Sequence, residues 1–136
     1  MRDRVSQTGP MTTILLVEDD PLQTYLIMSL LRRQPAAVRR AYDAAEAFCL
    51  VEQPDFARRL RLVISGHQTQ GIGGPAFVAE LHARMPRVPI VVLGMAGESP
   101  DSYEDDHVFF LPRHLVAERI VFLTNALLAP TKSQVA

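Results

Sequence analysis

The chain has 136 residues and a mass of 15.1 kDa, which fits a single domain with its own core and leaves too little chain for two. Hydrophobic residues make up 48% and charged residues 21%, an ordinary balance for a soluble globular protein. The formal net charge of -1 gives no sign of a nucleic-acid or membrane surface, and no apolar run approaches the ~20 residues of a membrane helix.

The N-terminal residues 1–11 carry charges but no apolar run, so we expect a flexible arm and not a signal peptide. The folded domain is predicted over 12–129, and residues 130–136 (PTKSQVA) are predicted to be a C-terminal tail. The single Cys49 cannot form an internal disulfide, which indicates a reducing cytoplasm. We expect its side chain to lie on a buried helix face.

The first predicted element is the apolar run Thr13–Val17 (TILLV), which lacks alternation and is typical of a strand buried on both faces of a parallel sheet. Asp20 followed by Pro21 predicts the start of a helix, which ends near Pro35. The residues that this helix places at helical spacing are Leu22, Tyr25, Leu26, Ser29 and Leu30.

A second strand and helix are predicted next. Ala37–Ala41 is a weaker strand candidate, and Asp43 begins a helix in which Glu46 completes a capping-box pattern. We expect this helix to run to Pro54. The run Leu60–Ser65 (LRLVIS) is then predicted to be the third strand.

The second half of the chain continues the alternation of helices and strands. Segment 94–107 contains Pro100 and five acids, so we expect a shortened fourth helix of one or two turns at most. Its acidic run 98–106 is interpreted as a solvated loop, with a surface for a basic partner as the alternative. The other predicted elements are a loop of small residues over 66–74, a helix from about Pro75 to Met85, strands Val88–Leu93 and Val108–Leu111, and a helix over Arg113–Ala129.

Strands that alternate with helices predict βαβ units with right-handed crossovers around a parallel sheet. The expected fold class is therefore α/β, a single doubly wound (βα)5 domain with a five-stranded parallel sheet. Open parallel sheets of this kind place their chemistry at the carboxyl ends of the strands. The residues at those ends therefore carry the functional interpretation.

Several sequence blocks resemble the receiver domain of bacterial response regulators, which has a flavodoxin-like fold. The blocks are ILLVEDDP, LVISG, GIGG, PIVVLG and FFLP, in this order, and the resemblance covers about residues 12–129. It implies a cytoplasmic protein of a two-component or phosphorelay signalling pathway. The implied partner is a signalling protein such as a histidine kinase or another regulator.

By the same resemblance, a working receiver holds Mg²⁺ with an acidic pair and accepts a phosphoryl group on an Asp. A Thr or Ser and a Lys contact the phosphoryl oxygens. Glu18 and Asp19 match the acidic pair, but Gly66 stands at the acceptor position, Gly94 at the Thr/Ser position and Leu111 at the Lys position. We therefore predict no catalytic residues, no enzyme activity and no cofactor. Residual Mg²⁺ binding at the acidic pair should be weak, because two carboxylates without a third ligand make a poor site.

The leading hypothesis is a degenerate receiver that is not phosphorylated and acts through protein–protein contacts. No shift of alignment restores the acceptor, because residues 56–100 contain no Asp, and Val108 stands where many receivers carry an aromatic switch residue. Two alternatives stay open: phosphorylation at an atypical residue such as Ser65 or His67, and a small-ligand sensor that uses the vacated pocket. After residue 129 too little chain remains for a DNA-binding output domain.

The final helix is predicted to mediate self-association or partner binding. Apolar residues beyond its core stripe indicate an interface, for which a two-fold homodimer is the expected assembly. The core stripe consists of Leu115, Val116, Ile120, Leu123 and Leu127, and the interface candidates are Val121, Phe122 and Leu128.

Overall fold

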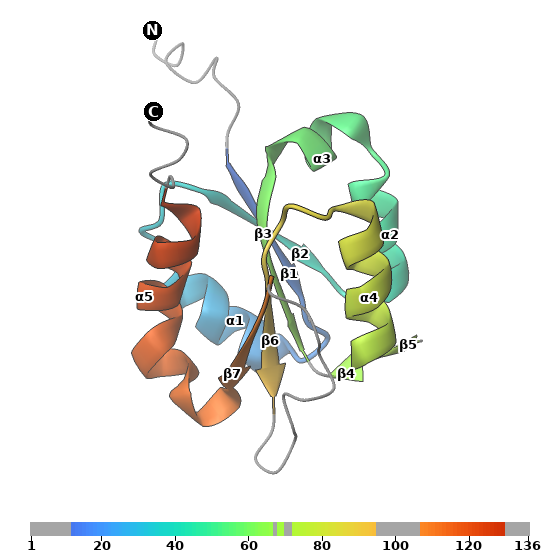
Figure 1. Cartoon of the computed structure of the whole chain (residues 1–136). Coiled ribbons are helices and arrows are strands. Elements are labelled where there is room, and N and C mark those ends of the chain that lie inside the picture. Colours follow the sequence, from blue (N-terminus) through green and yellow to red (C-terminus); the bar gives the residue numbers. More distant parts are fainter. Residues whose placement is uncertain (1–11, 67, 70–71, 95–106, 130–136) are drawn as a thin grey trace, which may run out of the picture.

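The computed structural model describes residues 12–66, 68–69, 72–94 and 107–129 (Figure 1). The elements in chain order are β1 (Thr13–Val17), α1 (Pro21–Leu30), β2 (Ala37–Ala41), α2 (Ala44–Val51), α3 (Pro54–Arg59), β3 (Leu60–Gly66), β4 (Gln68–Thr69), β5 (Ile72–Gly73), α4 (Gly74–Arg84), β6 (Ile90–Gly94), β7 (Val108–Pro112), the 3₁₀ helix η3 (Arg113–Leu115) and α5 (Val116–Leu128).

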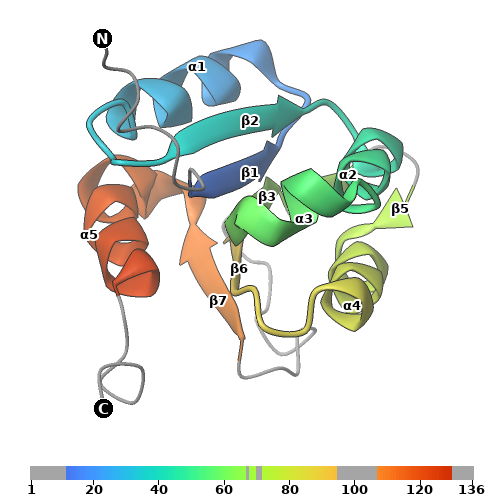
Figure 2. The same ribbon diagram turned by 90° about the horizontal axis from the view of Figure 1, so that it is seen from above.

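Five strands form one parallel sheet in the order β2-β1-β3-β6-β7. Helices α1 and α5 cover one face of the sheet, and α2, α3 and α4 cover the other (Figures 1 and 2). The predicted doubly wound α/β fold with a five-stranded parallel sheet is therefore confirmed. The chain reverses its direction of winding between β1 and β3, which makes the carboxyl ends of these two strands a topological switch point.

The central strands are apolar because both faces of the sheet are covered. Every residue of β1 and of β6 is buried, as expected for parallel strands with helices on both sides. Alternate side chains of β1 enter two separate core clusters: Leu15 joins the one under α2 and α4, and Leu16 joins the one under α1 and α5. The two edge strands differ, since β2 alternates between exposed and partly buried residues and β7 is mostly half-buried.

Helix α1 buries a different stripe from the one that the helical spacing marks. Its buried residues are Thr24 and Ile27, followed by Leu31 just beyond the helix, whereas Leu22 is 77% exposed and Tyr25 is 72% exposed. Both stripes are largely apolar, so a period of 3.6 residues alone cannot decide which one faces the sheet. The Asp20 N-cap is present as predicted, with its Oδ1 accepting a hydrogen bond from the Leu22 backbone N–H at 2.9 Å.

The helix predicted to reach Pro54 is in fact two helices. Helix α2 ends at Val51, and Pro54 begins the separate helix α3. Proline cannot donate the intrahelical hydrogen bond, but it fits the first position of a new helix, and the preceding Gln53 is extended. The buried position expected for Cys49 is also wrong, because its side chain is exposed on α2.

The loop predicted over 66–74 contains regular structure. Strand β3 extends to Gly66, and β4 pairs with β5 in a short antiparallel ladder just before α4 begins at Gly74. The first three residues expected in the final helix form a 3₁₀ turn. The N-terminal arm, the C-terminal tail and the shortened fourth helix lie outside the described residues. Over the described ranges, no helix combines the length and apolar character that crossing a membrane requires.

Candidate functional site

The sheet register brings the predicted site residues to one edge of the molecule. Gly66 pairs with Leu93, and Leu93 pairs in turn with Leu111 on β7. Gly94 lies one step further along, opposite Pro112. Glu18 follows β1, whose last residue is paired with the residue before Gly66. The acidic pair and the three degenerate positions therefore share the carboxyl edge of the sheet, as the sequence predicts.

Glu18 is almost completely buried at this edge, with its side chain 4% exposed. Its backbone N–H donates to the Ala41 carbonyl at 3.0 Å, and its own carbonyl accepts from Arg40 Nε at 2.9 Å. The carboxylate oxygen Oε2 accepts from the Asp20 backbone N–H at 3.2 Å. These bonds fix Glu18 in one orientation, so its charge points inward at the site and not into solvent. Asp19, its neighbour, is half-buried.

The cation that faces Glu18 is Arg113, the first residue of η3. Its Nη2 donates to Glu18 Oε1 at 3.1 Å, and its Nη1 donates to Gln23 Oε1 on α1 at 3.3 Å. The Arg113 side chain is only 21% exposed, so the ion pair is largely shielded from water. Charge-assisted pairs with little exposure have strong geometric preferences. Arg113 therefore joins the start of α5 to the β1–α1 connection.

This arrangement does not fit a Mg²⁺ ion held by the acidic pair. Mg²⁺ requires several free oxygen ligands in near-octahedral geometry, but both carboxylate oxygens of Glu18 already accept hydrogen bonds within the chain. In the part of the chain that the structure describes, no group of three or more His, Cys, Asp or Glu side chains is placed to hold a metal ion. We therefore derive no step through a metal at this edge.

The Thr/Ser position is occupied by an aromatic ring from the neighbouring strand. A Cβ atom added to Gly94 would lie 2.0 Å from Cζ of Phe110 and 2.7 Å from Cε1 and Cε2 of the same ring. Phe110 is half-buried and packs against the core cluster under α2 and α4. Gly94 is thus required by a close approach, because any larger residue would have to displace the ring.

The acceptor and Lys positions are closed as well. Gly66 is buried, and Leu111 is 4% exposed and belongs to the core cluster under α1 and α5. Ser65, one of the two atypical acceptors considered above, has 0% exposure, and its Oγ donates to the Gly66 carbonyl at 3.1 Å. The other, His67, lies outside the described residues.

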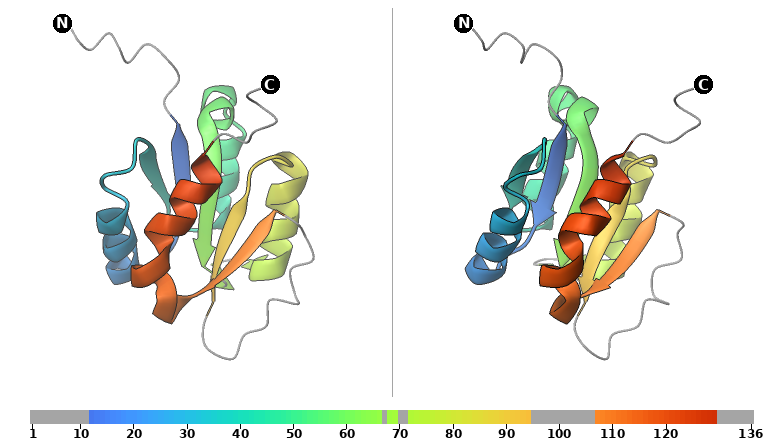
Figure 3. Two further views of the ribbon diagram at one scale, coloured as in Figure 1. Left: turned by 60° about the vertical axis from the view of Figure 1, so that its left-hand side comes forward. Right: turned by 90° about the vertical axis from the view of Figure 1, so that its left-hand side faces the viewer.

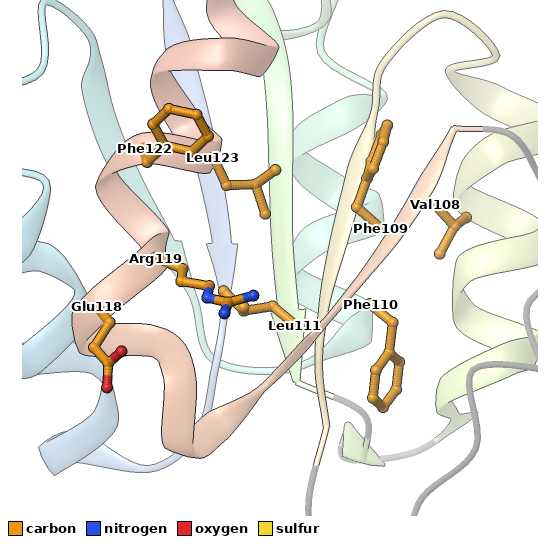
Figure 4. Close-up of a pocket in the computed structure, with 8 residues that line it drawn as sticks. All are labelled: Val108, Phe109, Phe110, Leu111, Glu118, Arg119, Phe122 and Leu123. Atoms are coloured by element: carbon orange, nitrogen blue, oxygen red, sulfur yellow. The ribbon is translucent and has the colours of Figure 1, made fainter.

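A cleft that described residues line lies between β7 and α5. It has a volume of about 650 Å³. Figure 4 shows Phe109, Leu111 and Leu123 between the strand and the helix, with Phe122 and Arg119 on the helix. The residues that line the cleft are Val108, Phe109, Phe110, Leu111, Glu118, Arg119, Phe122 and Leu123.

The three predicted interface residues differ in their environment. Phe122 is 78% exposed, as expected for an interface residue. Val121 and Leu128 are half-buried and pack against the core cluster under α1 and α5. Among the residues of the predicted core stripe, Val116 and Ile120 are buried, and Thr124 is buried with them. The exposed apolar surface of α5 is therefore centred on Phe122.

Two residues of this edge were not identified from the sequence. Arg113 was placed only as the first residue of a helix, and Phe110 only as part of an apolar strand. A buried carboxylate requires a partner, and Arg113 directly follows the FFLP block that ends at the same edge. The position of Arg113 directly after this block was therefore the sequence signal from which its pairing with Glu18 could have been inferred. The contact of Phe110 with Gly94 depends on strand pairing and had no signal in the sequence.

Comparisons with known proteins agree with this architecture. No family model matches the sequence, and no curated protein matches it either. Among solved structures, the receiver domain of NtrX from Brucella abortus has a TM-score of 0.74 at 23% identity, covering 87% of this chain and 99% of that one. The signal receiver domain of an HD domain-containing protein from Pseudomonas fluorescens has a TM-score of 0.74 at 21% identity, covering 87% of this chain and 94% of that one. The chemotaxis response regulator CheY4 of Vibrio cholerae has a TM-score of 0.71 at 19% identity, covering 87% of this chain and 99% of that one.

These neighbours share the fold over almost their whole length, so the chain has the receiver fold.

Proposed function

We propose that this chain is a receiver-like module of a bacterial two-component signalling pathway that is not phosphorylated and acts by contact with other signalling proteins. The observation that carries the proposal is the Arg113–Glu18 ion pair, in which the chain supplies its own cation to the acidic pocket. A cytoplasmic location and a lack of enzyme activity belong to the same proposal. The partners would be a histidine kinase or another regulator.

The chemistry of phosphoryl transfer supports this reading. A phosphoryl acceptor needs a nucleophile, and the new negative charge needs cations and hydrogen-bond donors around it. Gly66 has no nucleophile, Leu111 has no cation, and the Phe110 ring takes the space beside Gly94 in which a hydroxyl would stand. Of the two carboxylates of the acidic pair, Glu18 is paired with Arg113.

The alternative of an atypical acceptor at Ser65 is disfavoured by its complete burial. A phosphodonor could not reach Oγ without opening the carboxyl ends of β3 and its neighbours, and the product would carry a buried charge. The alternative of a ligand sensor in the vacated pocket is disfavoured because Phe110 and Leu111 fill that region. We therefore retain contact with other proteins as the proposed activity.

The decisive experiment is exposure of the purified protein to Mg²⁺ with acetyl phosphate or a phosphoramidate, followed by intact mass spectrometry. We expect no +80 Da adduct under conditions that fully modify a receiver with an intact acceptor Asp run in parallel. A stoichiometric adduct would refute the proposal. Peptide mapping would then decide between Ser65, His67 and other sites.

A further contact, separate from that with a histidine kinase or another regulator, is proposed at the cleft between β7 and α5, and its proposed occupant is a second copy of the chain. Phe122 is exposed at the rim of an apolar cleft, so the same surface provides a protruding side chain and a cleft to receive that side chain from a second copy. Glu118 and Arg119 line the same cleft, and a two-fold axis can bring the Glu of one copy to the Arg of the other. This self-complementarity favours a homodimer over an unrelated partner.

Sedimentation at tens of micromolar tests the homodimer. We expect a dimer that Phe122→Glu dissociates, because the substitution places a carboxylate in the apolar contact. The matched control is Leu22→Glu, which alters an equally exposed apolar residue on α1 and should leave the dimer intact. A monomeric wild type, or equal effects of the two variants, would remove this part of the proposal.

A further inference from the structure

Two histidines from distant parts of the chain face each other beside strand β6. His82 lies in the last turn of α4, and His107 immediately precedes β7. The centroids of their imidazole rings are 5.7 Å apart, and the ring planes are inclined by 38°. Helix α4, which carries His82, covers one face of the sheet, whereas α1 and α5 cover the other (Figures 1 and 3).

The backbone positions of both histidines are fixed by regular structure. His82 is followed by a further helical hydrogen bond, from Met85 N–H to the Leu81 carbonyl at 2.8 Å. The carbonyl of His107 accepts from the Ile90 N–H at 2.8 Å, which ties this residue to the start of β6. A ligand that bridged the two rings would therefore connect a helix to an edge strand. It would need little rearrangement of the backbone.

The two side chains differ in exposure in a way that suits a ligand from solution. His82 is half-buried against the body of the domain, whereas His107 is exposed. A small ion can therefore reach the pair from the solvent side of His107. It would lose part of its hydration shell against the more buried ring.

The distance between the rings fits shared coordination of one ion. A Zn²⁺–N bond of about 2.0–2.1 Å with a tetrahedral angle places the centres of two coordinating imidazoles about 5 Å apart. The observed separation of 5.7 Å is longer by roughly half an ångström, so the rings must close slightly when they share one ion. Imidazole nitrogen suits Zn²⁺, Cu²⁺ and Ni²⁺, whereas Mg²⁺ and Ca²⁺ require oxygen ligands.

The nearest cation on α4 is directed elsewhere. Arg84 forms ion pairs with Glu52 at 2.7 Å and with Glu80 at 2.9 Å. Its guanidinium carbon lies 4.6 Å from the centre of the Phe48 ring on α2. The hydrogen bonds with the two carboxylates, that of Glu80 first, raise the pKa of Arg84. This charge is balanced on the α2 side and does not face the histidine pair.

We propose that His82 and His107 form a two-histidine site for a transition-metal ion of the Zn²⁺ class, which clamps α4 to β7. Among the described residues, no third His, Cys, Asp or Glu side chain is placed with the pair to hold a metal ion. The site is independent of the proposed signalling function, because it uses none of the residues at the carboxyl edge.

Calorimetric titration of the intact chain with Zn²⁺ tests the site, with the exposed His114 as the matched control position. We expect saturable 1:1 binding that His107→Ala and His82→Gln each weaken roughly tenfold or more, in line with the effect of removing a metal-site residue. His114→Ala should bind Zn²⁺ like the wild type, and Mg²⁺ should give no heat. Zn²⁺ should also raise the melting temperature of the wild type and of His114→Ala, but not that of His107→Ala or His82→Gln.

Three results would overturn the site: no saturable binding up to millimolar Zn²⁺, wild-type affinity in His107→Ala, or an equal loss in His114→Ala. His107→Ala carries the test on its own if His82→Gln fails to fold, because the His107 side chain is exposed and its backbone hydrogen bond remains. Urea midpoints without metal establish that each variant is folded. The absence of phosphorylation is measured separately, so the two proposals fail independently.

Discussion

The close approach of Phe110 to Gly94 gives a quantitative prediction for Gly94→Ala. The new Cβ would lie 2.0 Å from the ring, whereas carbon atoms in contact lie about 3.5–4.0 Å apart. The ring must therefore move by roughly 1.5–2 Å away from the new Cβ, which disturbs its packing against the core cluster. Overpacking of this kind costs about 1–3 kcal/mol. We expect Gly94→Ala to lower the free energy of unfolding by about 2 kcal/mol.

The second part of the prediction is that the loss disappears when the ring is removed. Phe110→Ala alone should cost about 2 kcal/mol, roughly half of the value for a fully buried phenylalanine, because Phe110 is half-buried. In the Phe110→Ala background, the methyl group that Gly94→Ala adds no longer meets its three nearest atoms, all of which belong to the ring. The double variant should therefore lose about 2 kcal/mol and not about 4, which corresponds to a coupling energy of about 2 kcal/mol.

Urea denaturation measures these values through the midpoint, provided that the slope m stays unchanged. The control pair is Gly94→Ala with Phe122→Ala, since Phe122 is 78% exposed on α5 and is not one of the three nearest contacts of Gly94. Those two effects should add within about 0.5 kcal/mol. Additive losses for Gly94→Ala and Phe110→Ala would refute the reasoning, because they would show that the ring does not occupy the Thr/Ser position.

Two further predictions concern buried polar groups. Arg113→Met should lower the free energy of unfolding, measured by urea denaturation, by about 1–3 kcal/mol. The loss is smaller than for a fully buried pair because the Arg113 side chain is 21% exposed. The addition of Glu18→Gln should recover most of it. Thr124→Val should raise the free energy of unfolding by about 0.5–1.5 kcal/mol, because the buried Oγ1 of Thr124 has no hydrogen-bond partner among the described residues and valine has nearly the same shape. A lower melting temperature of Thr124→Val in calorimetry would contradict this.

Local signals in the sequence were sufficient for most of the fold. The apolar runs of β1 and β6 have no alternation because both faces are covered, and this feature predicts a parallel sheet directly. Asp43 caps α2 by accepting from the Glu46 N–H at 2.9 Å, as its spacing predicts. The return bond differs, since Glu46 Oε1 accepts from the N–H of Tyr42 at 2.7 Å and not from that of Asp43.

The errors arose where local signals compete or where tertiary contacts decide. Helix α1 offers two apolar stripes, and the sheet selects the one with Ile27, which leaves Leu22 exposed. The positions expected at the carboxyl ends of the strands do lie together there, because chain order and strand ends determine where they fall. Its actual contents were missed, because the Arg113–Glu18 pair and the Phe110–Gly94 contact each join residues from different elements. Pairing of this kind follows from the three-dimensional arrangement and not from spacing.

The occupied pocket leads to a prediction about restoring phosphorylation. Gly66→Asp, Gly94→Thr and Leu111→Lys together supply the missing nucleophile, hydroxyl and cation. We nevertheless expect no reaction, because Arg113 would still hold Glu18 and the Phe110 ring would still oppose a side chain at position 94. The new acceptor would also lie beside a cation that neutralises the carboxylate needed for Mg²⁺.

Removal of both intruding side chains should change this result. When Arg113→Met and Phe110→Ala are added to the three substitutions, the carboxylate becomes free for Mg²⁺ and the hydroxyl gains space. We expect a +80 Da adduct with acetyl phosphate only in the variant with all five substitutions. Intact mass spectrometry measures the adduct, after urea denaturation has shown that both variants fold. An equal rate of adduct formation in the variant with three substitutions would mean that Arg113 and Phe110 do not close the pocket. The loss of the Asp, the Thr/Ser and the Lys would then be sufficient to explain the inactivity.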